Sequence, residues 1–330
     1  MLTESLPRGF MVRHPSMDDM ASVLQLVQTC EIELEGSSET TLDDMRVEWQ
    51  MPSFNIATDA WVVSSPEGKI VGFSDVDQQE HARIYTSGNV HPNYRGRGVG
   101  THLLQLSEAR ALEHVPLALP DVRVALLSWT NYKNTAAQRL LGKQGFKQIR
   151  SSWRMKIELN EAPPAPAWAD SITVRILADD MSMFRAVFEA DEDAFKDHWG
   201  HIPVSFEFWE HWTRKRENFD PSLWFLAMDG NEIVGVSLCQ DEKEQGGWVH
   251  SLGVRRQWRR KGIGEALLHQ SFGEFYKRGI HDVYLGVDAQ SLTGATRLYE
   301  RVGMHIVRQS YTFEKELRAG KELSTQSVDL

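Results

Sequence analysis

Apolar and polar residues alternate in two sets of short runs, and both sets predict the same order of strands and helices. Each set opens with a strand containing Val-Arg, near Met11 and near Thr173, followed by one or two helices. Two strands joined by a tight turn come next, with "SPEGK" and "DGNE" as turn residues. A third strand, ending at Val90 or Val254, leads through a glycine-rich turn into a long amphipathic helix, a strand, a helix and a closing strand. This order predicts the α+β class (mixed α/β), in which a mostly antiparallel mixed sheet with one parallel step is flanked by helices.

The two sets are copies of one unit. The segment "MVRHPSMDDMASVLQLV" at 11–27 resembles "TVRILADDMSMFRAVFE" at 173–189, and further segments recur in the same order at near-constant spacing. Between the copies lies "NEAPPAPAWAD", Asn160–Asp170, whose prolines favour a stiff, extended spacer. We therefore expect an N-terminal domain at 1–159, a linker at 160–170, a C-terminal domain at 171–317 and a flexible polar tail at 318–330.

Composition narrows the class of protein. The apolar and charged fractions, 41% and 25%, are typical of globular domains. Neither a long apolar run nor a signal peptide is found, which favours a cytoplasmic protein. Cys30 and Cys239 are the only cysteines and lie in apolar segments, which argues against a disulfide framework, a metal site or a cysteine nucleophile. The net charge of −10 argues against nucleic acid or a membrane as partner and favours a cationic or amine substrate.

Both copies carry the arrangement Arg-x-x-Gly-x-Gly between a strand that ends in valine and the long helix, at 95–100 and at 259–264. Glycines at this place permit a tight turn, and they also uncover backbone N–H groups at the positive end of the helix dipole. In the second copy Arg259, Arg260 and Lys261 add positive charge to an otherwise acidic chain. A Walker loop and a GxGxxG fingerprint are absent. These features predict a pyrophosphate site.

The strand ending in valine, RxxGxG, the helix, the next strand and the later "LYERVGM" together resemble the GNAT acetyltransferase superfamily, over roughly 11–159 and 173–317. The tandem arrangement, with "VDAQSLTGATRLYERVGM" in the second copy, is similar to the mycothiol synthases. The resemblance implies two tandem GNAT-like domains, acetyl-CoA as the cofactor and no metal. The residues it implies for the cofactor are Leu252, Val254, Arg259, Arg260, Lys261, Gly262, Ile263, Gly264 and Glu265 in the second copy, and Val90, Arg95, Gly96, Arg97, Gly98 and Gly100 in the first.

The resemblance also implies where the chemistry occurs. The backbone at Leu252 and Val254 would pair with the pantetheine arm, and an N–H near Leu252 would stabilise an oxyanion. The family's general-acid tyrosine corresponds to Tyr299 in the second copy and to Leu141 in the first. We therefore expect catalysis in the second copy and a degenerate, structural first copy. Without the motif, a packing residue on an amphipathic helix would be the favoured interpretation of Tyr299.

A base must deprotonate the acceptor amine. His250 shares a strand face with Trp248 and Leu252 by period-two alternation and has a suitable pKa class, although a packing role is the alternative. Glu242 and Glu244 are further candidates, in a turn that reads as a solvated hairpin. As we align them, mycothiol synthases carry a glutamate where Trp248 stands, which leaves the identity of the acceptor open.

The acceptor is expected to bind the segment 188–212, which is rich in acidic and aromatic residues. Its acidic cluster would attract a cationic amine and its aromatic residues would wall a pocket. A solvated acidic helix face over an aromatic core is the alternative. The residues predicted to bind the acceptor are Glu192, Asp193, His198 and Trp199.

Together these patterns predict an N-acetyltransferase that moves an acetyl group from acetyl-CoA to a primary amine of a small molecule, by direct attack through a tetrahedral intermediate. One alternative acceptor is a protein or peptide amino group, which would require a wide, open groove. Another alternative is a coenzyme A sensor without turnover. A monomer and a homodimer are both compatible with the sequence.

Overall fold

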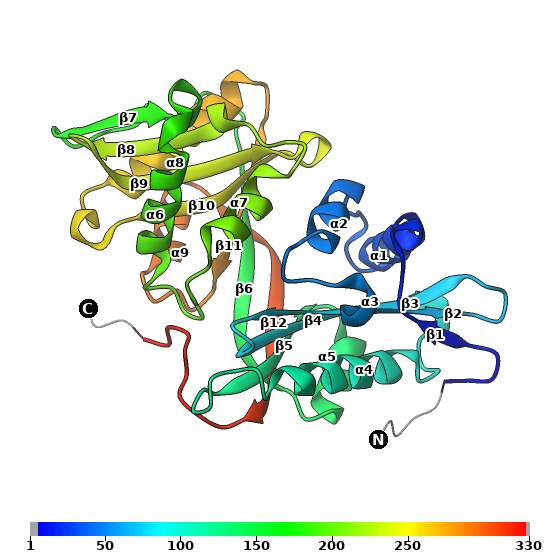
Figure 1. Ribbon diagram of the computed structural model, residues 1–330. Helices are drawn as coiled ribbons and strands as arrows, with labels where there is room; N and C mark the ends of the chain where they lie inside the picture. Colours follow the sequence, from blue (N-terminus) through cyan, green and yellow to red (C-terminus); the bar gives the residue numbers. More distant parts are fainter. Residues whose placement is uncertain (1–5, 328–330) are drawn as a thin grey trace. The chain divides into compact units, whose positions relative to one another are not determined.

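The computed structural model describes residues 6–327. The chain forms two compact units, and each is described by itself. Unit 1 comprises Met1–Arg150 and Ser310–Leu323, and unit 2 comprises Ser151–Gln309 and Ser324–Leu330. Figure 1 traces both units along the chain.

Unit 1 is one sheet with the strand order β1-β2-β3-β4-β5-β12. Its strands are β1 (Met11–Arg13), β2 (Ala60–Ser64), β3 (Ile70–Gln79), β4 (Arg83–Val90), β5 (Val124–Asn131) and β12 (His305–Arg318). Its helices are α1 (Met20–Glu35), α2 (Leu42–Trp49), α3 (Ile56–Asp59), α4 (Val99–His114) and α5 (Thr135–Lys143). Figure 1 shows α1 and α2 on one face of the sheet and α4 and α5 on the other.

Unit 2 repeats this plan with the strand order β6-β11-β10-β9-β8-β7. Its strands are β6 (Lys147–Glu158), β7 (Ile172–Ile176), β8 (Trp224–Asp229), β9 (Glu232–Asp241), β10 (Gly247–Val254) and β11 (Asp282–Asp288). Its helices are α6 (Phe184–Phe195), α7 (Phe206–Arg214), α8 (Ile263–Lys277) and α9 (Ala295–Arg301).

The sequence prediction of the fold class is confirmed in both units. Neighbouring strands within each unit are antiparallel except for β4 with β5 and β10 with β11. The long helices α4 and α8 connect the two strands of these parallel pairs. A parallel step requires a crossover connection, which a helix following the glycine turn provides. The stretch 160–170 contains no helix or strand, as its prolines predicted.

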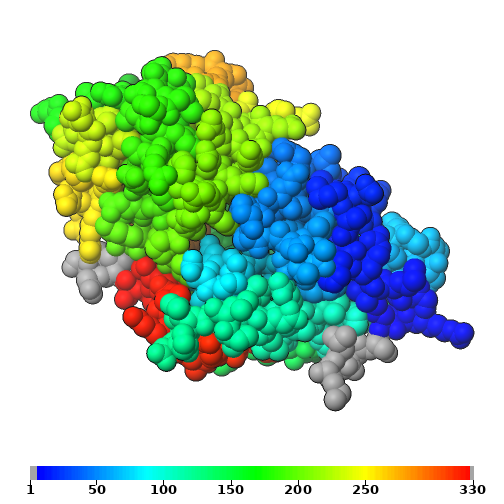
Figure 2. Space-filling model, viewed as in Figure 1, coloured from blue at the N-terminus to red at the C-terminus, as the bar shows by residue number. Residues whose placement is uncertain are grey.

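Side-chain alternation along the buried strands divides the core of each unit between the two faces. In unit 2, Leu226 and Met228 of β8 pack in the cluster around α6, whereas Phe225 and Ala227 pack with Ile263 of α8. Each fully buried apolar side chain contributes about 1.5–3 kcal/mol to folding. With all atoms drawn, the segment of α6 and α7 (green) forms surface of unit 2, and that of α1 and α2 (blue) forms surface of unit 1 (Figure 2).

The closing strands are exchanged between the two sequence copies. Strand β6, from the first copy, pairs antiparallel with β11, and β12, from the second copy, pairs antiparallel with β5. The similar sequences "WRMKIEL" and "YTFEKEL" provide compatible alternation, so Met155 fills the core around Phe272 in unit 2 and Phe313 fills the core of unit 1. The compact units therefore differ from the domains at 1–159 and 171–317 that the repeat predicted.

The tail is more extensively hydrogen-bonded than its polar sequence predicts. In unit 1 the Arg318 guanidinium donates to the carbonyls of Val115, Leu119 and Val122. The backbone N–H of Lys321 donates to Asp121 O at 2.7 Å. In unit 2 the residues after Ser324 bond to the loop that follows α6. Of the stretch at 318–330 that was expected to be flexible, only 328–330 lies outside the described residues.

Candidate active site

The sheet of unit 2 opens where β10 leaves β11. The parallel pairing of these strands covers Gly247–Val249 and ends at the Val249–Leu285 pair. At the same point β10 changes register against β9, with a bulge between Val249 and Ser251. A bulge bends a strand and interrupts its pairing. Within the described chain, the backbone groups of Leu252 and Val254 on the β11 side thus have no strand partner, as the predicted pairing with an extended ligand requires.

The bulged strand is held from behind by a buried carboxyl group. Ser251 donates a hydrogen bond to Oδ1 of Asp191 on α6, and the Trp209 indole N–H donates to Oδ2 at 3.1 Å. Burial raises the pKa of Asp191. This arrangement fixes α6 to β10, and no local sequence pattern predicted it.

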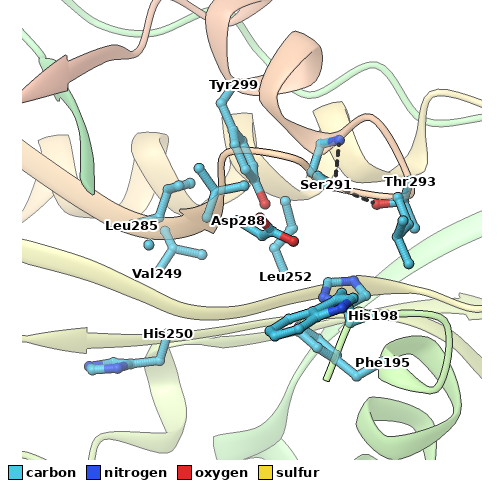
Figure 3. A pocket seen from close by; sticks show the side chains of 15 residues that line it. Phe195, His198, Val249, His250, Leu252, Leu285, Asp288, Ser291, Thr293 and Tyr299 are labelled. Carbon is cyan, nitrogen blue, oxygen red and sulfur yellow. Dashed lines mark hydrogen bonds between the residues drawn. The ribbon is translucent and has the colours of Figure 1, made fainter. Parts of the chain in front are cut away.

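A pocket of about 110 Å³ lies at the opening between the strands. Its lining comes from β10, from the β11–α9 connection and from the loop after α6: Phe195, His198, Trp199, Val249, His250, Leu252, Leu285, Gly286, Val287, Asp288, Ser291, Leu292, Thr293, Ala295 and Tyr299. Figure 3 shows Tyr299, Asp288 and Thr293 on one side of it and His198 on the other. The pocket therefore brings together the strand opening, the predicted acid and part of the predicted acceptor segment.

Tyr299 of α9 is 7% exposed, and its side chain points into the pocket (Figure 3). No hydrogen bond or ion pair engages its hydroxyl among the residues that the structure describes. Burial raises the pKa of Tyr299 to about 12, so the phenol stays protonated at neutral pH. This geometry leaves the proton available to a ligand in the pocket.

His250 lines the rim of the pocket, but its ring points away from Tyr299 (Figure 3). Its Nε2 lies 3.1 Å from Oε1 of Glu242. The Glu242 side chain is only 18% exposed and also accepts from the Asn218 amide at 2.9 Å. The expectation of a solvated carboxylate is therefore wrong for Glu242, whereas Glu244 is exposed. A carboxylate that orients an imidazole is a common acid–base arrangement.

The glycine turn of unit 2 ends in an uncapped helix. Gly262 is the N-cap of α8, with φ of +79° and no side-chain cap. The N–H groups of Ile263, Gly264 and Glu265, in the first turn of the helix, have no acceptor within the helix. The side chains of Arg260 and Lys261 are exposed and form no ion pair in the described part of the chain. Open N–H groups beside two cations fit a diphosphate.

The two glycines of this turn serve different purposes. A Cβ at Gly262 would meet nothing within 4 Å, so the left-handed φ is what requires glycine there. A Cβ at Gly264 would lie 3.2 Å from Leu298 of α9, so close packing requires glycine there. The spacing thus preserves both the turn and the approach of α9, which carries Tyr299.

Arg259, predicted to bind phosphate through its side chain, has a structural role instead. Its Nε donates to Val254 O at 2.9 Å, and its terminal nitrogens bind Asp197 Oδ2 at 2.5 Å and Ala194 O at 3.0 Å. Arg95 does the same in unit 1, where it bonds to Val90 O and Glu33. The arginine of the motif ties the turn to the preceding strand, so the phosphate charge is left to Arg260 and Lys261.

Arg260 adopts φ of +64° at the place that Gly96, with φ of +72°, holds in unit 1. A left-handed non-glycine residue costs about 1–2 kcal/mol, and glycine adds about 0.5–1 kcal/mol of unfolded-state entropy. We expect Arg260→Gly to raise the free energy of unfolding by about 0.5–1 kcal/mol, measured by urea denaturation, and to weaken acetyl-CoA binding severalfold. Lys261→Ala is the control, since it removes a charge without relieving φ. Equal stability changes in both variants would contradict the strain argument.

Unit 1 retains the turn but differs around it. Gly98 is the N-cap of α4 with φ of +81°, and a Cβ at Gly100 would lie 3.3 Å from Leu140. The guanidinium of Arg97 lies over the ring of Tyr94 at 5.0 Å. Strand β4 pairs with β3 without a register shift, so no bulge matches the one in β10. Leu141 is buried in the core at the position that corresponds to Tyr299.

The four predicted acceptor residues divide into two pairs. His198 and Trp199 line the pocket, whereas Glu192 and Asp193 do not. Asp193 pairs with Lys196 at 2.5 Å and with Arg255 at 3.4 Å. Three further lining residues were not predicted: Asp288, Ser291 and Thr293, in the "VDAQSLTG" stretch that also leads to Tyr299. Their position directly before α9 was the available signal.

The histidine in the pocket wall is neutral. Burial, the Arg259 cation and His201 lower the pKa of His198 to about 4. Its ring lies against Phe195, with the ring centres 4.2 Å apart. The wall opposite Tyr299 is therefore an uncharged aromatic surface at neutral pH, and Asp288 is the only carboxylate in the lining.

Glu192 is half-buried in unit 2, and burial raises its pKa to about 7. The protonated Glu192 carboxyl contributes to the free energy of unfolding. This contribution is fully present below the unfolded pKa near 4.5 and is lost as pH rises through 7. One pKa unit corresponds to about 1.4 kcal/mol, and partial exposure reduces the effect. Glu192→Gln should therefore raise the free energy of unfolding by about 1–2 kcal/mol at pH 8 and change it little at pH 5. Denaturant titrations at both pH values test this, and a gain at pH 5 alone would contradict it.

Other classes of site gain no support from the described residues. Within 6–327 no group of three or more His, Cys, Asp or Glu side chains could hold a metal ion. Over the same range, no helix is long and apolar enough to cross a membrane. Cys30 and Cys239 are both buried, and burial raises the pKa of Cys239 to about 11, so neither thiol is suited to nucleophilic attack.

Known proteins share both the sequence pattern and the fold. A model of the acetyltransferase (GNAT) family matches residues 184–304, and a model of the acetyltransferase (GNAT) domain matches residues 57–148. The mycothiol acetyltransferase of Thermobispora bispora is 31% identical over 225 residues, which cover 65% of this chain and 70% of the relative. That of Streptomyces scabiei is 30% identical over 243 residues, covering 71% and 72%.

Solved structures extend the similarity to almost the whole chain. A GCN5-related N-acetyltransferase from Sphaerobacter thermophilus has 35% sequence identity and a TM-score of 0.82, covering 98% of this chain and all of that one. A tandem GNAT protein from the clavulanic acid biosynthesis pathway, at 15% identity and a TM-score of 0.67, shares the fold. This chain therefore belongs to the GNAT acetyltransferase family and is an acyltransferase built from two GNAT domains.

Proposed function

We propose that the protein transfers an acetyl group from acetyl-CoA to the primary amine of a small molecule, and that unit 2 carries out the reaction. The observation that carries this proposal is the Tyr299 hydroxyl, which points into the pocket at the β10–β11 opening and has no hydrogen-bond partner within 6–327. Unit 1 has leucine at the corresponding position and no bulge in β4. Its glycine turn supports coenzyme A binding without turnover.

The residues of unit 2 fit the parts of the donor. The N–H groups at the start of α8, with Arg260 and Lys261, bind the diphosphate, because they are the open donors and unpaired cations there. The backbone of Leu252 and Val254 pairs with the pantetheine arm at the strand opening. The N–H near Leu252 then polarises the thioester carbonyl.

The acceptor amine attacks the thioester carbonyl directly, forming a C–N bond and a tetrahedral oxyanion. The C–S bond breaks as the oxyanion collapses, and Tyr299 gives its proton to the departing thiolate. The proton of the attacking ammonium leaves at the pocket rim, where His250 and Glu242 form the available acid–base pair. No enzyme-bound acyl intermediate is required, consistent with the buried thiols.

A small amine is favoured because the pocket measures about 110 Å³ and is closed by aromatic residues on the side of α6. Asp288 supplies a negative charge for the ammonium form of the acceptor. The relatives are named for mycothiol. With Trp248 stacked on Tyr284 at 6.0 Å, in place of the aligned glutamate, we assign the acceptor only as a small primary amine.

The test is release of free thiol from acetyl-CoA in the presence of a panel of amino sugars, aminoacyl conjugates and lysine peptides. Native mass spectrometry of the purified protein first identifies any retained ligand. We expect thiol release with at least one small amine and none with the peptides. Retention of acetyl-CoA without release for any amine would overturn the proposal and favour a sensor.

A further inference from the structure

The last described residues of the chain form two backbone hydrogen bonds with the loop that follows α6. The N–H of Gly200 donates to Thr325 O at 2.7 Å, and the N–H of Thr325 donates to His201 O at 3.1 Å. Gly200 lies in a turn with φ of +79°, so these two bonds hold a turn and not a strand. The tail thereby fixes the backbone of this loop.

Side-chain hydrogen bonds add to these two backbone bonds. The Thr325 hydroxyl donates to Lys196 O at 2.9 Å, and the Trp199 indole N–H donates to Gln326 Oε1 at 2.9 Å. The Gln326 amide N–H donates to Ser324 Oγ at 2.9 Å, and Ser324 is itself 5% exposed. Ser324 therefore orients the Gln326 amide, whose oxygen accepts the hydrogen bond from Trp199.

The loop held in this way, Lys196–His201, provides part of the pocket wall. His198 and Trp199 belong to the pocket lining, and His198 lies across from Tyr299 (Figure 3). Residues 201–205, which lead to α7, contain no helix or strand. Another side-chain anchor of the loop is Asp197, which pairs with Arg259 at 2.5 Å. The wall is thus held both by the glycine turn and by the tail.

We propose that Ser324–Gln326, which we name the C-terminal strap, positions the acceptor wall of the active site and so sets the affinity and selectivity for the amine. The inference rests on the proposed function of unit 2. The strap lies outside residues 184–304, which match the family model. Thr325 and Gln326 bond to the loop that carries His198 and Trp199, so we expect the strap to act on the acceptor and not on the donor.

The first experiment measures the loop without any substrate. Hydrogen–deuterium exchange of the full chain and of a chain ending at Leu323 compares the peptide that contains Gly200. Loss of the strap is expected to speed exchange of this peptide about tenfold or more, because its amide loses a hydrogen bond and its loop loses an anchor. Peptides from β8, in the core of unit 2, should exchange as before. Unchanged exchange at Gly200 would overturn the proposal whatever the catalytic activity.

Point variants then separate positioning from folding. Gln326→Glu keeps an oxygen for the Trp199 indole, whereas Gln326→Leu removes it. Thr325→Ser keeps the N–H and the hydroxyl, whereas Thr325→Pro removes the N–H that bonds to His201. We expect KM for the amine to rise about three- to tenfold in the Leu and Pro variants and to stay near the parent value in the Glu and Ser variants.

The donor provides the internal control. KM for acetyl-CoA, and its affinity measured by calorimetry, should be unchanged in all four variants. A parallel rise in both KM values would indicate a general structural defect and overturn a specific role for the strap. If acetyl-CoA binds but no amine is acetylated by the parent protein, the proposed function fails, while the exchange result still decides whether the strap holds the loop.

Discussion

Tyr299→Phe is expected to lower kcat by about a hundredfold or more while leaving the affinity for acetyl-CoA unchanged. Phenylalanine keeps the ring that packs in the core with Met304 and removes only the hydroxyl, so the fold should be preserved. The departing thiolate then loses its proton donor, and general acid catalysis is typically worth about 10²–10⁴-fold. Steady-state kinetics with saturating amine, together with calorimetric titration of acetyl-CoA, measure both quantities.

Tyr276→Phe in α8 is the matched control, because it removes a phenol hydroxyl from a partly buried tyrosine that is absent from the pocket lining. It should leave kcat unchanged. Because burial raises the pKa of Tyr299 to about 12, the parent enzyme should not lose its acid until pH approaches that value. A Tyr299→Phe enzyme with the parent kcat would remove the general acid from the mechanism.

Gly262→Val should reduce the affinity for acetyl-CoA by at least about a hundredfold. The added Cβ meets nothing, so the cause is the φ of +79°, which a β-branched residue rarely adopts. If the turn rearranges, the N–H groups of Ile263 and Gly264 no longer converge on the diphosphate. Hydrogen bonds to a charged group contribute about 1.5–3 kcal/mol each, so two of them account for a change of this size. Calorimetry with acetyl-CoA is the measurement.

The control is Gly273→Val, which adds the same side chain to the same helix at a position where a Cβ meets nothing and φ is not left-handed. It should bind acetyl-CoA like the parent, and α8 should be no less stable, because valine has a higher helix propensity than glycine. Equal affinities for the Gly262 and Gly273 variants would show that the turn does not hold the diphosphate.

Much of the fold could be predicted because its determinants are local. The order of elements and the parallel step could be predicted from the alternation along β8 and β9, from the turn glycines and from the repeat of each pattern. The family resemblance likewise came from contiguous motifs around Gly262 and Tyr299. Sequence reasoning predicted site roles for Tyr299, His198 and Trp199, and all three line the pocket. His250 was also predicted and lines the pocket, although its ring points away from Tyr299.

Other roles depended on contacts between distant residues. Arg259 carries the charge that a phosphate site needs, yet its guanidinium is used by Val254, Ala194 and Asp197. Glu192 belongs to the acidic cluster but is half-buried, and burial raises its pKa. A charge pattern does not reveal which charges the fold will neutralise, because the partners of Arg259 lie on other elements of the fold.

The sequence by itself determined the two GNAT units, the glycine turns and the difference between Tyr299 and Leu141, since each is written in a short stretch with its own backbone preference. Only the tertiary structure decided the exchange of the closing strands, the bulge in β10 and the strap at Ser324–Gln326. Pairing partners are selected by complementary surfaces far apart along the chain, and β6 and β12 carry nearly equivalent patterns. Local propensity could not choose between those pairings, whereas packing in the two cores did.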